Sequence, residues 1–137
     1  MYSKILLAVD GSEHSRKALE AACEIARVSG AEVLVVHFQE RDISKGGAYD
    51  LETETEGMQL VRTAEAMLET AGVSARAVMR PIMYGYAAQE ILAEAAAFKP
   101  DLIVMGTRGL SDFTELLIGS VSHKVMHLAQ CPVLVAR

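Results

Sequence analysis

Short aliphatic segments alternate with longer amphipathic segments along all 137 residues, and this order strongly limits the folds open to the chain. Five segments are aliphatic and β-branched and are expected to be strands: residues 4–9, 32–38, 74–79, 101–105 and 132–136. Four segments have apolar residues at helical spacing and are expected to be helices: residues 13–29, 58–71, 86–98 and 121–129. The alternation predicts an α/β fold with a parallel sheet, right-handed crossovers and helices on both faces.

Length and composition fit one domain of this kind, covering residues 1–137. A chain of this length buries roughly two-thirds of its unfolded surface in one core. Hydrophobic residues make up 51% of the sequence but aromatic residues only 5%, so we expect a core of Ala, Val, Leu, Ile and Met. The net charge is −5 and no segment gathers Lys and Arg on one face, which argues against nucleic acid or an anionic membrane as a partner.

The cysteines and the apolar runs bear on the compartment of the protein. Cys23 and Cys131 lie far apart in apolar patterns, which favours reduced core thiols over a disulfide or a metal pair. The apolar run at residues 5–9 is too short for a secretory signal, and no segment reaches the roughly 20 apolar residues that span a bilayer. We therefore expect a cytoplasmic protein.

Glycines recur at fixed spacing between the fourth expected strand and the last expected helix. Gly106 and Gly109 follow the strand end at Met105, and Gly119 precedes Ser120, which we expect to cap the helix. Glycines let backbone N–H groups approach a ligand, and a helix N-terminus adds partial positive charge, so the arrangement suits a phosphate. The alternative is that Gly106 and Gly109 only make a turn and Gly119 only relieves crowding at the helix cap. The pattern is neither a Walker loop nor the Gly-x-Gly-x-x-Gly dinucleotide fingerprint.

The pattern Gly106-x2-Gly109-x9-Gly119-Ser120 resembles the nucleotide-binding motif of the universal stress protein family. Three other stretches resemble further signatures of that family in the same order: residues 4–12 (KILLAVDGS), 34–37 (LVVH) and 131–135 (CPVLV). The resemblance spans nearly the whole chain. It implies a Rossmann-like three-layer sandwich with a five-stranded parallel sheet of order 3-2-1-4-5. The first and fourth strands would then meet where the chain direction across the sheet reverses, and ligands bind in the crevice at such a point.

The resemblance also implies a ligand, which is ATP or another adenine nucleotide (ADP or AMP) bound with Mg2+. Asp10, the acidic residue after the first strand, would contact the nucleoside or its metal ion. Ala8 and Val9 would wall the base pocket, and the main chain at Val36 would read the adenine edge. The rival interpretation of Asp10 is an ordinary helix-start residue.

The phosphates would be lined by N–H and hydroxyl donors at the two ends of the glycine motif. With the strand end, the residues assigned to this part of the site are Met105, Gly106, Thr107, Arg108, Gly109, Gly119, Ser120, Val121 and Ser122. Arg108 either pairs with a terminal phosphate or points to solvent. Asp112 and Glu115 stand where the family often has neutral or basic residues, and they would weaken triphosphate binding unless a divalent cation lies between the charges.

Several features outside the motif leave alternatives open. The acidic stretch of residues 39–57, from Gln39 to Gly57, is expected to be a loop, either a solvated connector or a lid over the ligand. His123 and His127 are four residues apart and are expected to be ordinary helix histidines rather than metal ligands. His14 is expected at an exposed helix start, although it could approach the ligand.

The last expected strand, from Pro132 to Ala136, is apolar without alternation and lies at a sheet edge in the order given above. An apolar edge favours pairing with another strand, and the family resemblance implies dimers through it, so we expect a homodimer.

The sequence predicts an ATP-binding universal stress protein that acts as a nucleotide-dependent stress-response regulator, with slow or no hydrolysis. No residue is assigned a catalytic role, because none resembles a positioned general base for water. Two alternatives stay open: a nucleotide hydrolase or transferase that uses Asp10 and Mg2+, and a dimeric interaction module that binds no nucleotide.

Overall fold

All five expected strands pair into one parallel sheet in the computed structural model, which describes residues 1–43, 48–50, 53–107 and 118–137. In spatial order these strands are β4 (Ala75–Met83), β2 (Glu32–Ile43), β1 (Lys4–Ala8), β5 (Leu102–Gly106) and β6 (Val133–Ala136). Counted along the chain, the parallel strands have the order 3-2-1-4-5, so the fold prediction is confirmed. A further short strand, β3 (Ala48–Asp50), pairs antiparallel with the end of β2.

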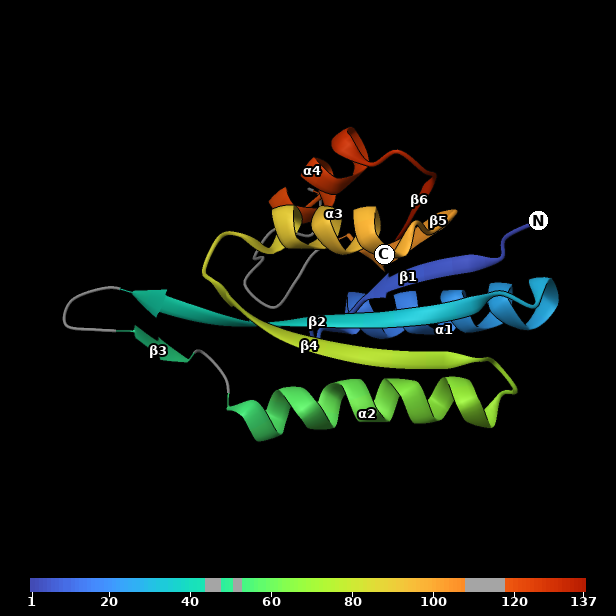
Figure 1. The fold of residues 1–137 in the computed structure, drawn as a ribbon, viewed down its shortest axis with the longest axis horizontal. Helices are drawn as coiled ribbons and strands as arrows, with labels where there is room; N and C mark the ends of the chain where they lie inside the picture. Colours follow the sequence, from blue (N-terminus) through green and yellow to red (C-terminus); the bar gives the residue numbers. More distant parts are fainter. Residues whose placement is uncertain (44–47, 51–52, 108–117) are drawn as a thin grey trace.

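The helices form two layers around this sheet (Figure 1). One layer consists of α1 (Glu13–Ser29) and α2 (Glu54–Thr70), and the other of α3 (Ala87–Phe98) and α4 (Ser120–Leu128). Alternate strand residues serve the two layers: Leu7 and Val35 pack with α1 and α2, whereas Leu6 and Val36 pack with α3 and α4. These four residues are all 0% exposed, so the centre of the sheet is closed to solvent on both faces.

Local capping explains where the first two helices begin and end. The Ser12 hydroxyl accepts a hydrogen bond from the Ser15 N–H at 3.1 Å, and Gly30 ends α1 in the left-handed conformation that glycine favours. The bounds of α1 are therefore the predicted ones. Helix α2 begins four residues before its predicted start, because the Thr53 hydroxyl accepts from the Glu56 N–H at 3.1 Å and donates to the Glu56 carboxylate.

The prediction of a loop over residues 39–57 was wrong at both ends. Strand β2 continues to Ile43, because β4 pairs with it as far as Arg41 and β3 pairs with its last three residues. The β2–β3 ribbon projects beyond the rest of the sheet (Figure 1). Residues 44–47 and 51–52 lie outside the described part of the chain.

Strand β4 also passes through Pro81, where we expected it to stop. Among the described residues β4 pairs with β2 alone, so one of its edges is open. The Tyr84 N–H donates to the Arg41 carbonyl, so the main chain of Tyr84 faces β2. Successive residues of a strand face opposite edges, and Pro81, three residues earlier, therefore presents its nitrogen to the open edge. The missing N–H of proline costs no sheet hydrogen bond at such a position.

Both cysteines are free thiols. Cys23 belongs to α1 and is buried in the core, as expected, whereas Cys131 is partly exposed and packs at the margin of the other core cluster. Burial raises the pKa of the Cys131 thiol. Among the described residues, every helix is too short or too polar to cross a membrane.

Candidate functional site

Strands β1 and β5 lie side by side and end at the same edge of the sheet, as the switch point requires. Their register pairs Ile5 with Leu102 and Leu7 with Val104. From β1 the chain continues to β2 on one side, and from β5 it continues to β6 on the other. The residues that follow the two strands therefore face one crevice, which is where open α/β sheets bind ligands.

Asp10 forms a tight turn at the end of β1. Its carboxylate oxygen Oδ1 accepts a hydrogen bond from the Ser12 N–H at 2.9 Å, and its own N–H donates to the Ser15 hydroxyl at 3.0 Å. The turn is thus built by hydrogen bonds within the first residues of α1. Within the described chain, the other carboxylate oxygen, Oδ2, has no partner, and it is the atom that a metal ion or a ligand hydroxyl would meet.

Gly106, at the end of β5, lies against the first turn of α1. A Cβ atom at this position would be 2.7 Å from the His14 Cβ and 2.9 Å from the His14 carbonyl carbon. Contacts this short are not tolerated, so α1 can only pack here against a glycine. The structure therefore shows a packing reason for Gly106, which neither the phosphate interpretation nor the turn interpretation of the sequence included.

Thr107 is fixed by three hydrogen bonds to three different elements. Its N–H donates to the Ala136 carbonyl at 2.7 Å, its carbonyl accepts from the Gly119 N–H at 2.6 Å, and its hydroxyl is hydrogen-bonded to the His14 ring nitrogen Nδ1 at 2.8 Å. Only 7% of the residue is exposed. Thr107 thus joins β6, α4 and α1 at the mouth of the crevice.

The start of α4 differs from the prediction by one residue. Gly119, not Ser120, is the N-cap, and it makes no side-chain cap because it has none. The first hydrogen bond of the helix runs from the His123 N–H to the Gly119 carbonyl, so the N–H groups of Ser120, Val121 and Ser122 have no partner within the helix. Three backbone donors are therefore grouped at the positive end of the helix dipole.

The Ser122 side chain, in contrast, serves the protein itself. Its hydroxyl donates to the Gly106 carbonyl at 2.6 Å, and the residue is 3% exposed. This hydrogen bond fastens the first turn of α4 to the end of β5. The hydroxyl hydrogen of Ser122 is therefore already used, whereas its N–H has no partner within the helix.

The residues assigned to the adenine base differ in their exposure. Ala8 is partly exposed, whereas Val9 and Val36 are at most 6% exposed and belong to the core, as does Met105 at the end of β5. The Val36 carbonyl accepts a hydrogen bond from the Val9 N–H at 3.0 Å. Val36 is therefore part of the β1–β2 ladder.

Phe38 is the residue of β2 that the sequence did not single out at this edge. Residues two apart on a strand present their main-chain groups to the same side, so Phe38 faces the β1 edge as Val36 does. The pairing of β1 with β2 ends at Val36. Phe38 is consequently the first residue of β2 whose N–H and C=O face that edge beyond the end of β1.

Two histidines that received no firm role in the sequence hold the crevice together. His37 is 4% exposed, and its ring nitrogen Nδ1 donates a hydrogen at 2.8 Å to the Val9 carbonyl, which can only accept. His14 bridges to Thr107, as described above. The partners lie 28 and 93 positions away in the chain, so no local pattern could have indicated these contacts.

A sequence model of the universal stress protein family matches residues 1–137. The chain belongs to the universal stress protein family. It is 42% identical over 141 residues to a universal stress protein of Thermus aquaticus and 34% identical over 151 residues to the universal stress protein YxiE of Bacillus subtilis. In both comparisons the match covers 100% of each chain. The resemblance stated from the motifs is thereby confirmed.

Solved structures of the family are similar in fold to this universal stress protein. A universal stress protein in complex with cAMP has a TM-score of 0.73 and 26% identity, covering 99% of this chain and 97% of that one. The universal stress protein of Archaeoglobus fulgidus in complex with dAMP has a TM-score of 0.75 and 25% identity, covering 99% and 98%. Relatives of this protein thus bind adenine nucleotides.

Part of the glycine motif of this universal stress protein lies outside the described residues. Arg108 and Gly109, assigned to the site, and the acidic residues Asp112 and Glu115 all fall in residues 108–117. Their assignments remain predictions.

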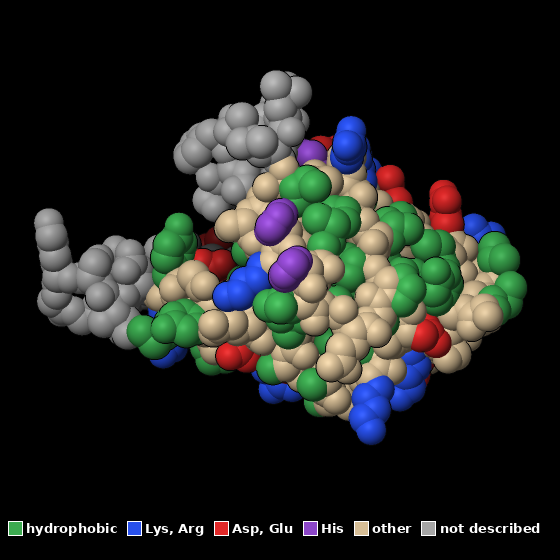
Figure 2. Space-filling view, turned by 90° about the horizontal axis from the view of Figure 1, so that it is seen from above, with side chains coloured by type: hydrophobic (Ala, Val, Ile, Leu, Met, Phe, Trp, Pro, Cys, Tyr) green, Lys and Arg blue, Asp and Glu red, His purple; other side chains and the backbone are tan. Residues whose placement is uncertain are grey.

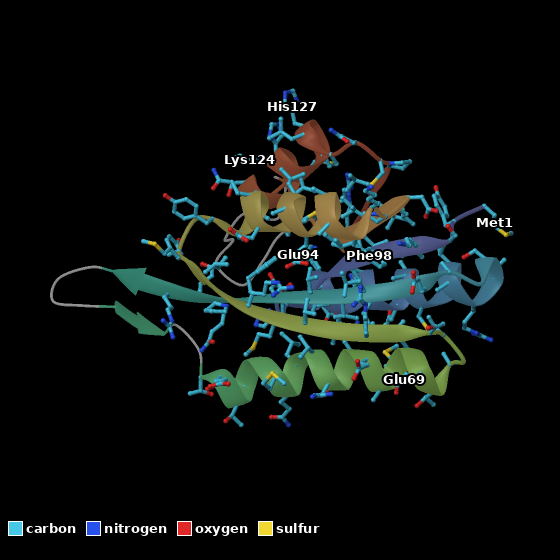
Figure 3. The ribbon with its side chains drawn as sticks, viewed as in Figure 1. Met1, Glu69, Glu94, Phe98, Lys124 and His127 are labelled. Carbon is cyan, nitrogen blue, oxygen red and sulfur yellow. The ribbon has the colours of Figure 1, made fainter. Side chains whose placement is uncertain are left out.

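The two histidines of α4 lie on the outer surface of this universal stress protein. His123 and His127 are exposed, and His127 points away from the sheet, as does Lys124 (Figure 3). Figure 2, which looks onto the α3–α4 layer, shows histidine side chains on this face. Within the described residues no three His, Cys, Asp or Glu side chains are grouped to hold a metal ion.

Proposed function

We propose that this universal stress protein binds an adenine nucleotide, ATP or else ADP or AMP, in the crevice between β1 and β5. The observation that carries the proposal is the group of three N–H donors at the start of α4, which hydrogen bonds from Ser122 and Gly119 hold beside the carboxyl end of β5. Donors of this kind bind phosphate without any basic side chain. Relatives in complex with cAMP and dAMP support adenine as the base.

The geometry suggests how the parts of the nucleotide are divided. The phosphates would lie at Ser120, Val121 and Ser122, with Gly106, Thr107, Arg108, Gly109 and Gly119 around them. Asp10 would hold Mg2+ or a ribose hydroxyl through Oδ2. The adenine edge would meet the main chain of β2 near Val36, and Phe38 is better placed for this because the Val36 carbonyl already serves the sheet.

We further propose that the protein acts as a nucleotide-dependent regulator of a stress response, with slow or no hydrolysis. Among the described residues, His14 at the crevice is hydrogen-bonded to Thr107 through Nδ1, and Asp10 is assigned in this proposal to Mg2+ or a ribose hydroxyl, so neither is given the role of a general base for water. A second chain would pair with the free edge of β6 to form a homodimer.

A proline substitution at Ser120 tests the phosphate site with little change to the fold. Ser120 is the first residue of α4, where proline fits the helix and removes the N–H donor together with the side-chain hydroxyl. The preceding residue, Gly119, has ψ 157°, which a following proline allows. Loss of even one hydrogen bond to a charged phosphate costs about 1.5 kcal/mol, so Ser120→Pro, which lacks both donors of this residue, should weaken ATP binding by roughly tenfold or more in calorimetry and leave adenosine binding unchanged.

A matched control is Glu54→Pro, at the first residue of α2. Its preceding residue, Thr53, has ψ 155°, and α2 packs against β4 and β2 in the layer opposite α4. Glu54→Pro should bind ATP as the wild type does. If Ser120→Pro bound ATP with wild-type affinity, α4 would not be part of the phosphate site. Mg-ATP at a hundred times its Kd should stabilise the wild type by about 2.7 kcal/mol, and the absence of any stabilisation would contradict nucleotide binding.

A further inference from the structure

The first turn of α1 and the end of β5 are in direct contact, although they are far apart in the chain. Because Gly106 has no side chain, the backbone of β5 comes close to His14, the second residue of α1. This approach brings the His14 ring within hydrogen-bond distance of the next residue, and Nδ1 lies 2.8 Å from the Thr107 hydroxyl.

From Thr107 the hydrogen bonds continue to α4. The Thr107 carbonyl accepts from the Gly119 N–H at 2.6 Å, and Gly119 is the N-cap whose carbonyl accepts the first hydrogen bond of the helix. The Thr107 N–H is itself held by Ala136 in β6. His14 is therefore joined through one threonine to the helix end that carries the three N–H donors.

We propose that His14 is a positioning residue for this N-terminus of α4. It fixes the rotamer and place of Thr107, and the Thr107 carbonyl in turn fixes Gly119 and the directions of the N–H groups that follow. The part of the inference that concerns nucleotide rests on the proposed function. In this proposal His14 acts on the ligand through Thr107 and not by contact with a phosphate.

Because His14 acts on α4, its loss should weaken the binding of the phosphates and not that of the adenine. N–H donors that are held in place before the ligand arrives lose little conformational entropy on binding. When the donors become mobile, this entropy cost is added and the affinity falls. In the proposed site the adenine lies at β2, and the hydrogen bonds that run from His14 through Thr107 do not lead to that strand. Loss of His14 should therefore weaken ATP while leaving adenosine unaffected.

The variants follow from the two hydrogen-bonding atoms. His14→Leu removes the ring nitrogen at similar volume, and Thr107→Val removes the hydroxyl while keeping the branched shape. His14→Asn restores a polar atom near the place of Nδ1. The matched controls are His127→Leu, on the outer face of α4, and Thr63→Val, whose hydroxyl bonds only the Gln59 carbonyl within α2.

The first measurement needs no ligand. Amide hydrogen exchange of Gly119, followed by NMR in the full chain, should be about tenfold faster in His14→Leu and in Thr107→Val than in the wild type. The double variant should be no faster than either single variant, because both remove the same hydrogen bond. His14→Asn should return the rate toward the wild type, and both controls should match it.

The second measurement is the affinity for ATP and for adenosine by calorimetry. We expect ATP binding about tenfold weaker in His14→Leu and Thr107→Val, recovery in His14→Asn, and unchanged adenosine binding. Wild-type Gly119 exchange in folded His14→Leu or Thr107→Val, or additive effects in the double variant, would overturn the positioning role. If the wild type bound no ATP, the proposed function would fail, while the exchange rates would still decide whether His14 positions α4.

Discussion

Gly106 shows at the scale of one residue that a ligand motif can also be a packing motif. The glycine spacing indicated a phosphate site, yet the nearest atoms to a Cβ at this position belong to His14 and Ser15 of α1, within 3.0 Å. The helix that follows β1 thus requires this glycine whether or not a ligand is present. A loss of binding in a Gly106 variant would therefore not by itself locate a phosphate.

Gly106→Ala should lower the free energy of unfolding by about 1–3 kcal/mol, because the backbone atoms in contact cannot move aside freely. Gly106→Leu should cost more, since a longer side chain meets the same atoms. Gly30 is the comparison: nothing lies within 4 Å of a Cβ there, and its φ of 77° alone penalises a side chain. At Gly30, Ala and Leu should therefore cost about the same, roughly 1–2 kcal/mol. Urea unfolding of the four variants would measure this, and equal costs for Ala and Leu at Gly106 would contradict the crowding.

At the scale of the element, the structure separates what local sequence determines from what it does not. Helix α1 has its predicted bounds because Ser12 and Gly30 both act on neighbouring residues. The extension of β2 to Ile43 and the passage of β4 through Pro81 depend on strands that are distant in sequence, so the polar residues after Phe38 were taken for a loop. In the candidate site, too, some features follow from local sequence and others depend on residues that are distant in the chain.

The strand ends that form the crevice follow from the alternation of elements and the family order. The contacts that fix those ends, such as His14 to Thr107 and Val9 to Val36, join residues that are remote in the chain. Single-sequence patterns describe neighbours, and they carry no direct signal for such pairs. The N-cap of α4 was misplaced by one residue because Ser120 is a preferred capping residue, while the structure uses Gly119.

Asp101 joins the beginnings of β1 and β5. Its carboxylate accepts hydrogen bonds from the Ser3 N–H at 2.9 Å, the Ser3 hydroxyl at 2.8 Å and the Lys4 N–H at 3.1 Å. Partial desolvation raises the pKa of Asp101, but these hydrogen bonds outweigh it and hold the pKa below its ordinary value. A carboxylate with a lowered pKa stabilises the fold above its unfolded pKa of about 3.9, and this contribution is lost as the pH falls through the folded pKa.

Asp101→Asn should therefore lower the free energy of unfolding by about 1 kcal/mol at pH 7, a value discounted because the group is partly solvated. The difference between wild type and variant should shrink as the pH falls from 5 to 3. Urea unfolding at these pH values would test it, with Glu69→Gln on the surface of α2 (Figure 3) as a control that changes stability by less than about 0.5 kcal/mol. A difference that stayed constant with pH would contradict the role assigned to the charge.

At the scale of the whole molecule, the two edges of the parallel sheet differ. One edge strand is β4, which contains Pro81. The other is β6, which carries the apolar run Val133–Ala136 and pairs, among the described residues, only with β5. The Pro132 and Ala136 carbonyls accept from β5, so residues 132, 134 and 136 face inward, and Val133 and Val135 present their main-chain groups outward. This is the edge at which we propose that two copies pair.

Val135→Pro tests the dimer without removing any β5–β6 hydrogen bond, because the missing N–H is one that faces outward. The wild type should scatter light at micromolar concentration with twice the mass of one chain, and Val135→Pro should scatter as a monomer with its circular dichroism retained. Leu134→Pro is the counterpart: its N–H faces β5, so this variant should lose a ladder hydrogen bond and unfold more easily, by about 3 kcal/mol. A wild type found only as a monomer, or a Val135→Pro variant that remained dimeric, would show that copies of the chain do not associate through the main chain of β6.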